Sequence, residues 1–277
     1  MVFGRGVGMH TLIRVGPVSL FFGVLAALAL HGQNSQPAGT VPAPPQRVDA
    51  PAPGASPEAL EKRGDELREG KNYLDAVDFY RAALKGTPGN ASLFNKIGIC
   101  QLQIQNFKEA KKNFERAIRL DRKHADAYNN LGVVYYETRN YNPAIRQYEK
   151  AIALQDASAS FYSNLGAAYF GKKQFDKAIQ NYSKALQLDP DIFERTSHAG
   201  VQAQLPSPED RAHYDYVVAK LYAKNGDPER SLHYLKKAME EGYKDINNVY
   251  KDEEFSALRK DPRFTELMAA KTIAIPE

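Results

Sequence analysis

The sequence has 277 residues, of which 43% are hydrophobic and 25% are charged, a composition that is ordinary for a soluble globular protein. Its formal net charge is only +4, and the Lys and Arg residues are interspersed with Asp and Glu, which excludes the concentrated basic surface of a nucleic-acid-binding protein. The single cysteine, Cys100, excludes an internal disulfide and is expected to be a buried thiol.

Residues 1–32 have the pattern of a targeting segment. Arg5 and Arg14 precede an apolar run from Val15 to Leu30, and Ala27 and Ala29 near its end form an A-x-A arrangement. This pattern predicts a secretory signal peptide and therefore export to the periplasm or the extracellular space. The alternative is an uncleaved inner-membrane anchor, because about 16 apolar residues approach the length of a membrane span.

Residues 33–56 are rich in Pro, Ala and Gly and contain almost nothing that would build a core. They are predicted to be an extended, disordered linker between the N-terminal segment and the folded part.

Residues 57–192 repeat with a period of 34 in four copies, 57–90, 91–124, 125–158 and 159–192. In the third copy the recurring positions are Tyr128, Leu131, Gly132, Tyr135, Tyr141, Ala144, Tyr148, Ala151 and Leu154. The large residues fall at helical spacing around a small one, such as Gly132 or Ala144, which predicts two closely packed antiparallel helices per copy. Clusters such as Gly70-Lys71-Asn72 and Arg139-Asn140 mark the turns between the two helices.

This pattern resembles the tetratricopeptide repeat (TPR). The resemblance implies an all-α fold, a right-handed superhelix of helical hairpins in which the first helix of each hairpin lines a concave face. It also implies a binding protein of the bacterial cell-envelope type. A hairpin cannot bury its apolar stripe alone, so each copy is expected to pack on the next.

Residues 193–208 interrupt the repeat phase and are predicted to be a linker. Residues 209–277 are predicted to hold a fifth, degenerate hairpin with Gly226-Asp227-Pro228 as its turn, followed by C-terminal capping helices. In the cap, Phe255, Leu258, Phe264 and Leu267 are expected to face inward.

The sequence contains no pattern typical of catalysis or cofactor binding. The histidines have no metal-ligand spacing, and the phosphate-binding loop, the nucleophile elbow and the H-E-x-x-H helix are all absent from it. Acidic pairs such as Glu253 and Glu254 are interpreted as solvated helix surface. We therefore expect no catalytic residue, no metal and no cofactor, and a protein that is not an enzyme.

The predicted binding residues lie around the glycine of each first helix. Related arrays with Asn-Leu-Gly at this place hold the backbone of an extended peptide with asparagine amides, and Asn130 and Asn164 match that motif. The predicted groove consists of the amides Asn95, Asn129, Asn130 and Asn164 and an apolar floor of Ile99, Val133, Tyr136 and Phe170. An amide both donates and accepts, so it can pair with any peptide bond. The alternatives are that the asparagines are ordinary helix surface and that Tyr136 and Phe170 only fill hairpin interfaces.

A grip on acidic chain ends, known from other TPR arrays, is rejected because Glu61, Asp65 and Asp126 at the corresponding places would repel a carboxylate. The predicted function is therefore an exported adaptor that binds a protein or peptide in the cell envelope, without nucleic acid and with membrane contact only through an uncleaved N-terminal segment. The alternatives are an enzyme or enzyme-accessory subunit that uses the C-terminal region, and a structural assembly subunit that uses the convex face.

Overall fold

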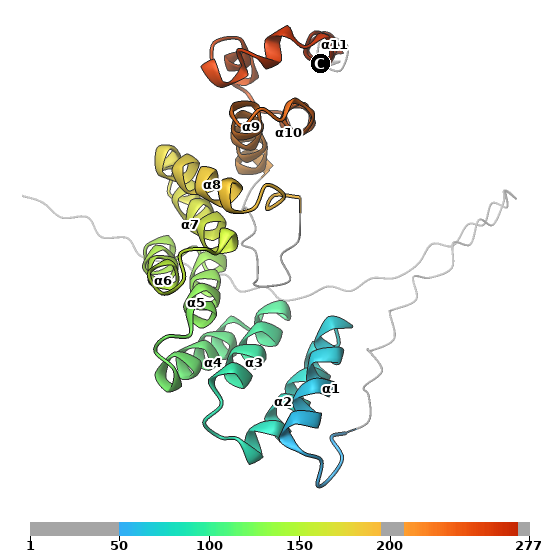
Figure 1. The fold of residues 1–277 in the computed structure, drawn as a ribbon, viewed down its shortest axis with the longest axis vertical. Coiled ribbons are helices and arrows are strands. Elements are labelled where there is room, and N and C mark those ends of the chain that lie inside the picture. The colour runs from blue at the N-terminus through green and yellow to red at the C-terminus, as the bar shows by residue number, and fades with distance from the viewer. Residues whose placement is uncertain (1–49, 195–207, 271–277) are drawn as a thin grey trace, which may run out of the picture. The chain divides into compact units, whose positions relative to one another are not determined.

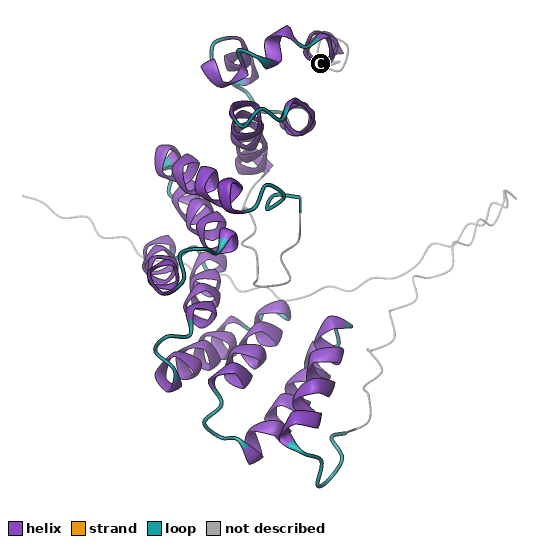
Figure 2. Ribbon diagram, viewed as in Figure 1, coloured by secondary structure: helices purple, strands orange, loops and turns teal. Residues whose placement is uncertain are grey.

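The computed structural model describes residues 50–194 and 208–270, and the predicted N-terminal signal, most of the 33–56 linker and most of the 193–208 linker lie outside these ranges. Eleven α-helices and three short 3-10 helices make up the described part, in which no strand occurs (Figures 1 and 2). The first eight are α1 (Pro57–Glu69), α2 (Tyr73–Gly86), α3 (Ala91–Gln103), α4 (Phe107–Leu120), α5 (Ala125–Glu137), α6 (Tyr141–Leu154), α7 (Ala159–Gly171) and α8 (Phe175–Leu188). They are followed by α9 (Pro208–Lys224), α10 (Pro228–Glu240), η1 (Ile246–Tyr250), η2 (Glu253–Phe255), η3 (Leu258–Lys260) and α11 (Pro262–Ala270). The predicted all-α fold class is confirmed.

Each hairpin turn closes in the same way. The residue in the left-handed conformation is Lys71, Gln105, Arg139 or Lys173, with φ between 58° and 61°. The next residue then donates its N–H to a carbonyl five residues back, as from Asn140 to Tyr135 at 2.7 Å. This bond satisfies a carbonyl that the helix end leaves unpaired, and it reverses the chain. The turns therefore lie where the Gly, Asn and Lys clusters predicted them.

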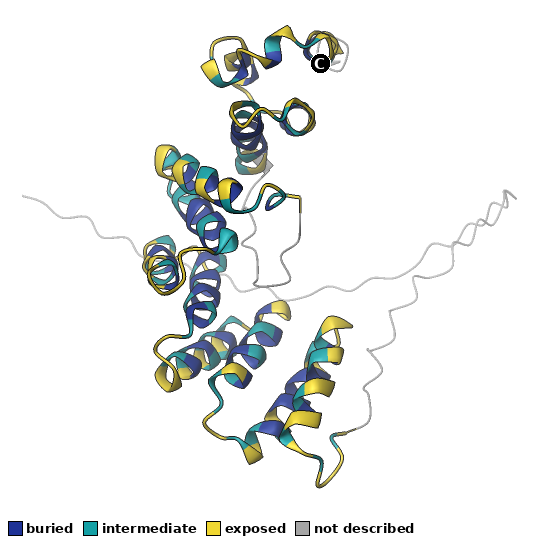
Figure 3. Ribbon diagram, viewed as in Figure 1, coloured by how far each residue is buried: buried dark blue, intermediate teal, exposed yellow. Residues whose placement is uncertain are grey.

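Within each hairpin the two helices approach at the predicted glycine. A Cβ atom built on Gly132 would lie 2.5 Å from the ring of Tyr148, and the same contact recurs between Gly64 and Tyr80, Gly98 and Phe114, and Gly166 and Tyr182. Only glycine leaves room for the aromatic ring, which is fully buried in every copy. Along the helices, buried residues alternate with exposed ones (Figure 3).

The second helix of each hairpin then packs on the first helix of the next, as α2 on α3, α4 on α5 and α6 on α7. The fifth hairpin, α9–α10, continues the array, and its turn uses Gly226 in the left-handed conformation. Beyond it the cap buries Phe255, Leu258 and Phe264 as expected, whereas Leu267 is only partly buried. Among the helices that the structure describes, none is long and apolar enough to cross a membrane.

Candidate binding site

The predicted amides are buried and bonded to one another. Asn129 and Asn130 are 0% exposed, Asn164 is 2% exposed and Asn95 is 7% exposed. The Nδ2 of Asn164 donates to the Oδ1 of Asn129 at 2.9 Å, and the Nδ2 of Asn130 donates to the Oδ1 of Asn95 at 3.1 Å. A bond of 3.3 Å from Asn129 to Asn130 joins the two pairs into one chain of amides. In this structure the asparagines are therefore links inside the array and not free helix surface.

An ion pair between residues 35 positions apart joins the first two hairpins, as the asparagine bonds join the later ones. Lys96 stands at the position of Asn130, two residues before the glycine, and its Nζ lies 2.7 Å from Glu61 Oε1, which is three residues before the preceding glycine. Lys96 also lies 2.7 Å from Asp65 Oδ2. We call Glu61, Lys96, Asn95, Asn130, Asn129 and Asn164 the polar ladder. It connects α1, α3, α5 and α7 with one bond per junction, each between residues 35 apart.

The charges at the start of the ladder form ion pairs with one another. Burial alone would lower the pKa of Lys96, but its hydrogen bonds to the carboxylates of Asp65 and Glu61 raise that pKa above its usual range. Asp65 also accepts a hydrogen bond of 2.8 Å from the hydroxyl of Tyr80. This end of the ladder is therefore an ion-pair network in which the ammonium of Lys96 already has two carboxylate partners.

The predicted apolar floor is largely enclosed. Val133, Tyr136 and Phe170 are buried, and Ile99 is half-buried. The ring of Phe170 lies 5.1 Å from that of His213 in α9, so Phe170 fills the contact between the fourth and fifth hairpins. Tyr136 packs 5.5 Å from Tyr141 across its own hairpin. These contacts fit the interface alternative, and a direct contact of these residues with a peptide stays a prediction.

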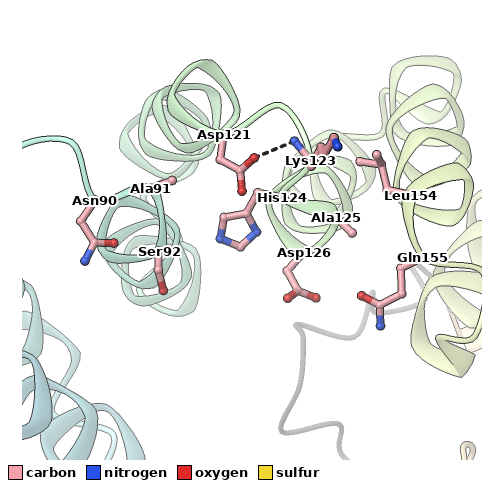
Figure 4. A pocket seen from close by; sticks show the side chains of 10 residues that line it. All are labelled: Asn90, Ala91, Ser92, Asp121, Lys123, His124, Ala125, Asp126, Leu154 and Gln155. Atoms are coloured by element: carbon pink, nitrogen blue, oxygen red, sulfur yellow. Dashed lines mark hydrogen bonds between the residues drawn. The ribbon is translucent and has the colours of Figure 1, made fainter.

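An open hollow of about 500 Å³ lies at the N-terminal ends of α3 and α5 (Figure 4). It is lined by Asn90, Ala91, Ser92, Asp121, Lys123, His124, Ala125, Asp126, Leu154 and Gln155. Asp126, in the first turn of α5, is half-buried, and this burial raises the pKa of its carboxyl while nearby His124 lowers it. Two carboxylates against one lysine give the hollow a slight acidic excess. It therefore suits a group that donates hydrogen bonds or carries a positive charge.

Sequence reasoning did not identify this hollow. Its residues come from the ends of the second and third hairpins, and none of the recurring positions other than Leu154 contributes to it. The one available signal was Asp126, which stands in the first turn where the second and fourth copies have Ser92 and Ser160.

Metal and thiol chemistry are not supported by the described side chains. Within residues 50–194 and 208–270, no group of three or more His, Cys, Asp or Glu residues is arranged to hold a metal ion. Burial raises the pKa of the Cys100 thiol to about 12, so the thiol stays protonated at neutral pH and is a poor nucleophile.

We expect the polar ladder to contribute measurably to the free energy of unfolding. Asn130→Ala removes the donor to Asn95 and the acceptor of Asn129, so it is expected to lower the free energy of unfolding by about 1 to 2 kcal/mol. Denaturant unfolding measures this difference. Asn181→Ala, on the exposed side of α8, removes a comparable amide that bonds only to the carbonyl of Lys177, and it is the control. Equal losses in the two variants would contradict a structural role of the ladder.

Comparison with known proteins supports the repeat assignment. Models of the tetratricopeptide repeat match residues 91–157 and 159–192. Sperm-associated antigen 1 of Mus musculus is 33% identical over 61 residues, which are 22% of this chain and only 7% of the mouse protein. Repeats of this family are generally non-catalytic scaffolds for protein–protein interaction.

Several solved structures are similar in part. A MamA crystal structure is 25% identical, with 64% of this chain and 93% of that chain covered and a TM-score of 0.45. MamA of Desulfovibrio magneticus is 19% identical, with 66% and 93% covered and a TM-score of 0.48. YrrB, a TPR protein with an unusual peptide-binding site, is 20% identical, with 69% and 90% covered and a TM-score of 0.45. The assignment itself rests on the family models and on the hairpin geometry, and by both criteria residues 91–157 and 159–192 are tetratricopeptide repeats.

Proposed function

We propose that this protein is an exported, non-enzymatic scaffold that binds a protein or peptide partner in the cell envelope along the first helices of its repeats. The observation that carries the proposal is the open hollow between the ends of α3, α5 and α6. It offers solvent-accessible polar groups next to the polar ladder, on the same two first helices.

The hollow defines the chemistry expected of the partner. The hollow contains two carboxylates, Asp121 and Asp126, and one lysine, Lys123. Asp121 already accepts a hydrogen bond of 2.8 Å from the backbone N–H of Lys123, which leaves Asp126 as the carboxylate considered for the partner. A lysine or arginine side chain of the partner would pair with Asp126. The exposed methyl groups of Leu154 provide an apolar wall beside it.

The ladder asparagines are the second part of the proposal. To hold a peptide backbone, Asn130 and Asn164 would exchange their amide–amide bonds for bonds to peptide groups, which have the same donors and acceptors. Each bond given up leaves the amide oxygen of Asn95 or Asn129 without its donor, so the exchange requires the peptide to donate N–H groups to these two oxygens as well.

The test uses the full-length chain with a C-terminal tag, expressed in its own cells and purified from separated cytoplasmic, periplasmic and membrane fractions. Export requires recovery outside the cytoplasm, and the N-terminal sequence of the recovered protein distinguishes cleavage near Ala29 from retention as an anchor. Recovery only from the cytoplasm would contradict the exported role.

Asp126→Lys reverses the charge in the hollow and is expected to weaken binding of the co-purified partner about tenfold, which is the value of one lost charged contact. Asp176→Lys makes the same charge change on the exposed first turn of α8 and is expected to leave binding unchanged. The Asn130→Ala, Asn164→Ala double variant, compared at a temperature where it is folded, reports on the ladder. Retention of the partner by all three variants would exclude this face as the binding surface.

A further inference from the structure

The aromatic ring that packs on the glycine of each hairpin carries a hydroxyl in three of the four repeats. The four rings belong to Tyr80, Phe114, Tyr148 and Tyr182. In the first repeat the hydroxyl of Tyr80 donates to Asp65, the residue directly after the glycine, at 2.8 Å. The geometry of this hairpin therefore places the hydroxyl within reach of the side chain at that position.

The later repeats have no side-chain acceptor at this position. The residue after the glycine is Ile99, Val133 and Ala167 in the second, third and fourth repeats. The second repeat has Phe114 and so has no hydroxyl to satisfy. Tyr148 and Tyr182 keep theirs, and both hydroxyls are fully buried without a hydrogen-bond partner in the described structure.

A third hydroxyl shares their surroundings. Tyr136 of α5 is 3% exposed, and its hydroxyl also has no partner within the described ranges. Burial first, and then the neighbouring phenol of Tyr136, raise the pKa of Tyr148. Burial, Tyr214 and Tyr136 raise the pKa of Tyr182. Tyr136 and Tyr148 belong to the same buried cluster of the core. With their pKa values raised, all three phenols remain neutral hydrogen-bond donors.

Such hydroxyls are costly unless something accepts from them. A buried donor without an acceptor loses its hydrogen bonds to water and gains none in the protein. Phenylalanine would fill the same space without that loss. Phe114 shows that phenylalanine fits this position in the same array.

The missing acceptor is expected to be uncharged. Glu137 and Asp210 lie near enough to Tyr136 to contribute, after burial and Tyr141, to the rise of its pKa, so the surroundings are acidic. A carboxylate would be repelled there and would lose its hydration. A peptide carbonyl is neutral, and Val133, Ala167 and Phe170 provide apolar neighbours for the side chains of such a peptide.

We infer that the hydroxyls of Tyr136, Tyr148 and Tyr182 donate hydrogen bonds to backbone carbonyls of an extended, apolar segment of the partner. This inference rests on the proposed function and extends it, because the basic group in the hollow and the apolar segment at the hydroxyls would belong to one peptide. The hollow lies at the start of α5 and Tyr136 near its end.

The first turns of α9 pack on Tyr182 and Phe170. The ring of Tyr214 lies 5.5 Å from that of Tyr182, and the ring of His213 lies 5.1 Å from that of Phe170. The junction between α8 and α9 is less extensive than the junctions between the earlier hairpins. The peptide would therefore enter by displacing these turns, at the junction where the backbones of neighbouring hairpins are least closely packed.

The experiment compares the same substitution at sites with and without an internal acceptor. Twelve-residue peptides are selected from a random library on the full-length chain, and their affinities are measured for the wild type, for the Tyr148→Phe, Tyr182→Phe double variant and for Tyr80→Phe. The double variant is expected to bind about tenfold more weakly, as for two lost hydrogen bonds, with an unchanged or higher Tm. Tyr80→Phe is expected to lower the Tm without weakening binding, because its hydroxyl is already used by Asp65.

Three results would overturn the inference. Equal peptide affinity of the double variant and the wild type would show that the hydroxyls do not contact the peptide. A Tm loss in the double variant as large as that of Tyr80→Phe would show that water already satisfies the hydroxyls. A library that yields no binder would contradict the proposed function itself, whereas the first two results leave that function intact.

Discussion

Gly132→Leu is expected to lower the free energy of unfolding by about 3 kcal/mol, the upper part of the range for overpacking a core. The Cβ alone would lie 2.5 Å from Cε1 and 2.7 Å from Cδ1 of Tyr148, and both distances are far inside van der Waals contact. The ring cannot turn away because Tyr148 is fully buried within the third hairpin. The two helices must therefore separate, and the contacts of α5 and α6 with their neighbours weaken with them.

Thermal and denaturant unfolding measure this loss, and hydrogen exchange locates it in α5 and α6. Gly89→Leu is the control, because a Cβ at Gly89 meets no atom within 4 Å. It is expected to change stability by less than about 0.5 kcal/mol, as surface substitutions usually do. An unchanged Tm of the Gly132 variant would contradict the packing described for every hairpin.

Asp215→Asn is expected to raise stability at neutral pH by about 3 kcal/mol and to flatten its pH dependence. Asp215 of α9 is 3% exposed. Burial raises the pKa of its carboxyl to about 6, against a partial lowering by Lys237. The other charged groups that face it are Glu241, which raises this pKa, and His233, which lowers it.

The direction in which stability changes with pH follows from the raised pKa of Asp215. Between about pH 4 and pH 6 the folded state holds a proton on Asp215 that the unfolded state has released. The free energy of unfolding is therefore highest below this window and falls as the pH rises through it. Asparagine has no charge to bury, so the variant should lose this fall while keeping an acceptor for Lys237, which lies 3.4 Å from Asp215 Oδ1.

Urea unfolding at intervals from pH 4 to pH 7 measures the effect. Asp176→Asn, at an exposed position of α8, makes the same change in net charge and separates the general effect of charge from that of burial. Parallel curves for Asp215→Asn and the wild type across the window would show that Asp215 is not the titrating group.

The helices and their turns were predictable because their causes are local. All eight helices of the four repeats follow from apolar residues at helical spacing and from one glycine per hairpin, and short-range bonds close every turn. Even so, the sequence did not reveal which turn residue takes the left-handed conformation. Gly70 would be the natural candidate, but Lys71 adopts it, with φ of 61°, as do Gln105, Arg139 and Lys173. The bond to a carbonyl five residues back selects the position, whatever residue occupies it.

The all-α repeat architecture, the length of each hairpin and the positions around each glycine can therefore be read from the sequence alone. The contacts that those positions make follow only from the packed helices. The asparagines predicted to face a peptide pair with one another at an offset of 35 residues. Within the described residues, the hydroxyls of Tyr148 and Tyr182 have no acceptor where that of Tyr80 has Asp65. The asparagine pairs come from the way one hairpin stacks on the next, whereas the Tyr80–Asp65 bond comes from the packing of two helices within one hairpin. Stacking brings together side chains distant in the sequence, and helical periodicity carries no information about them.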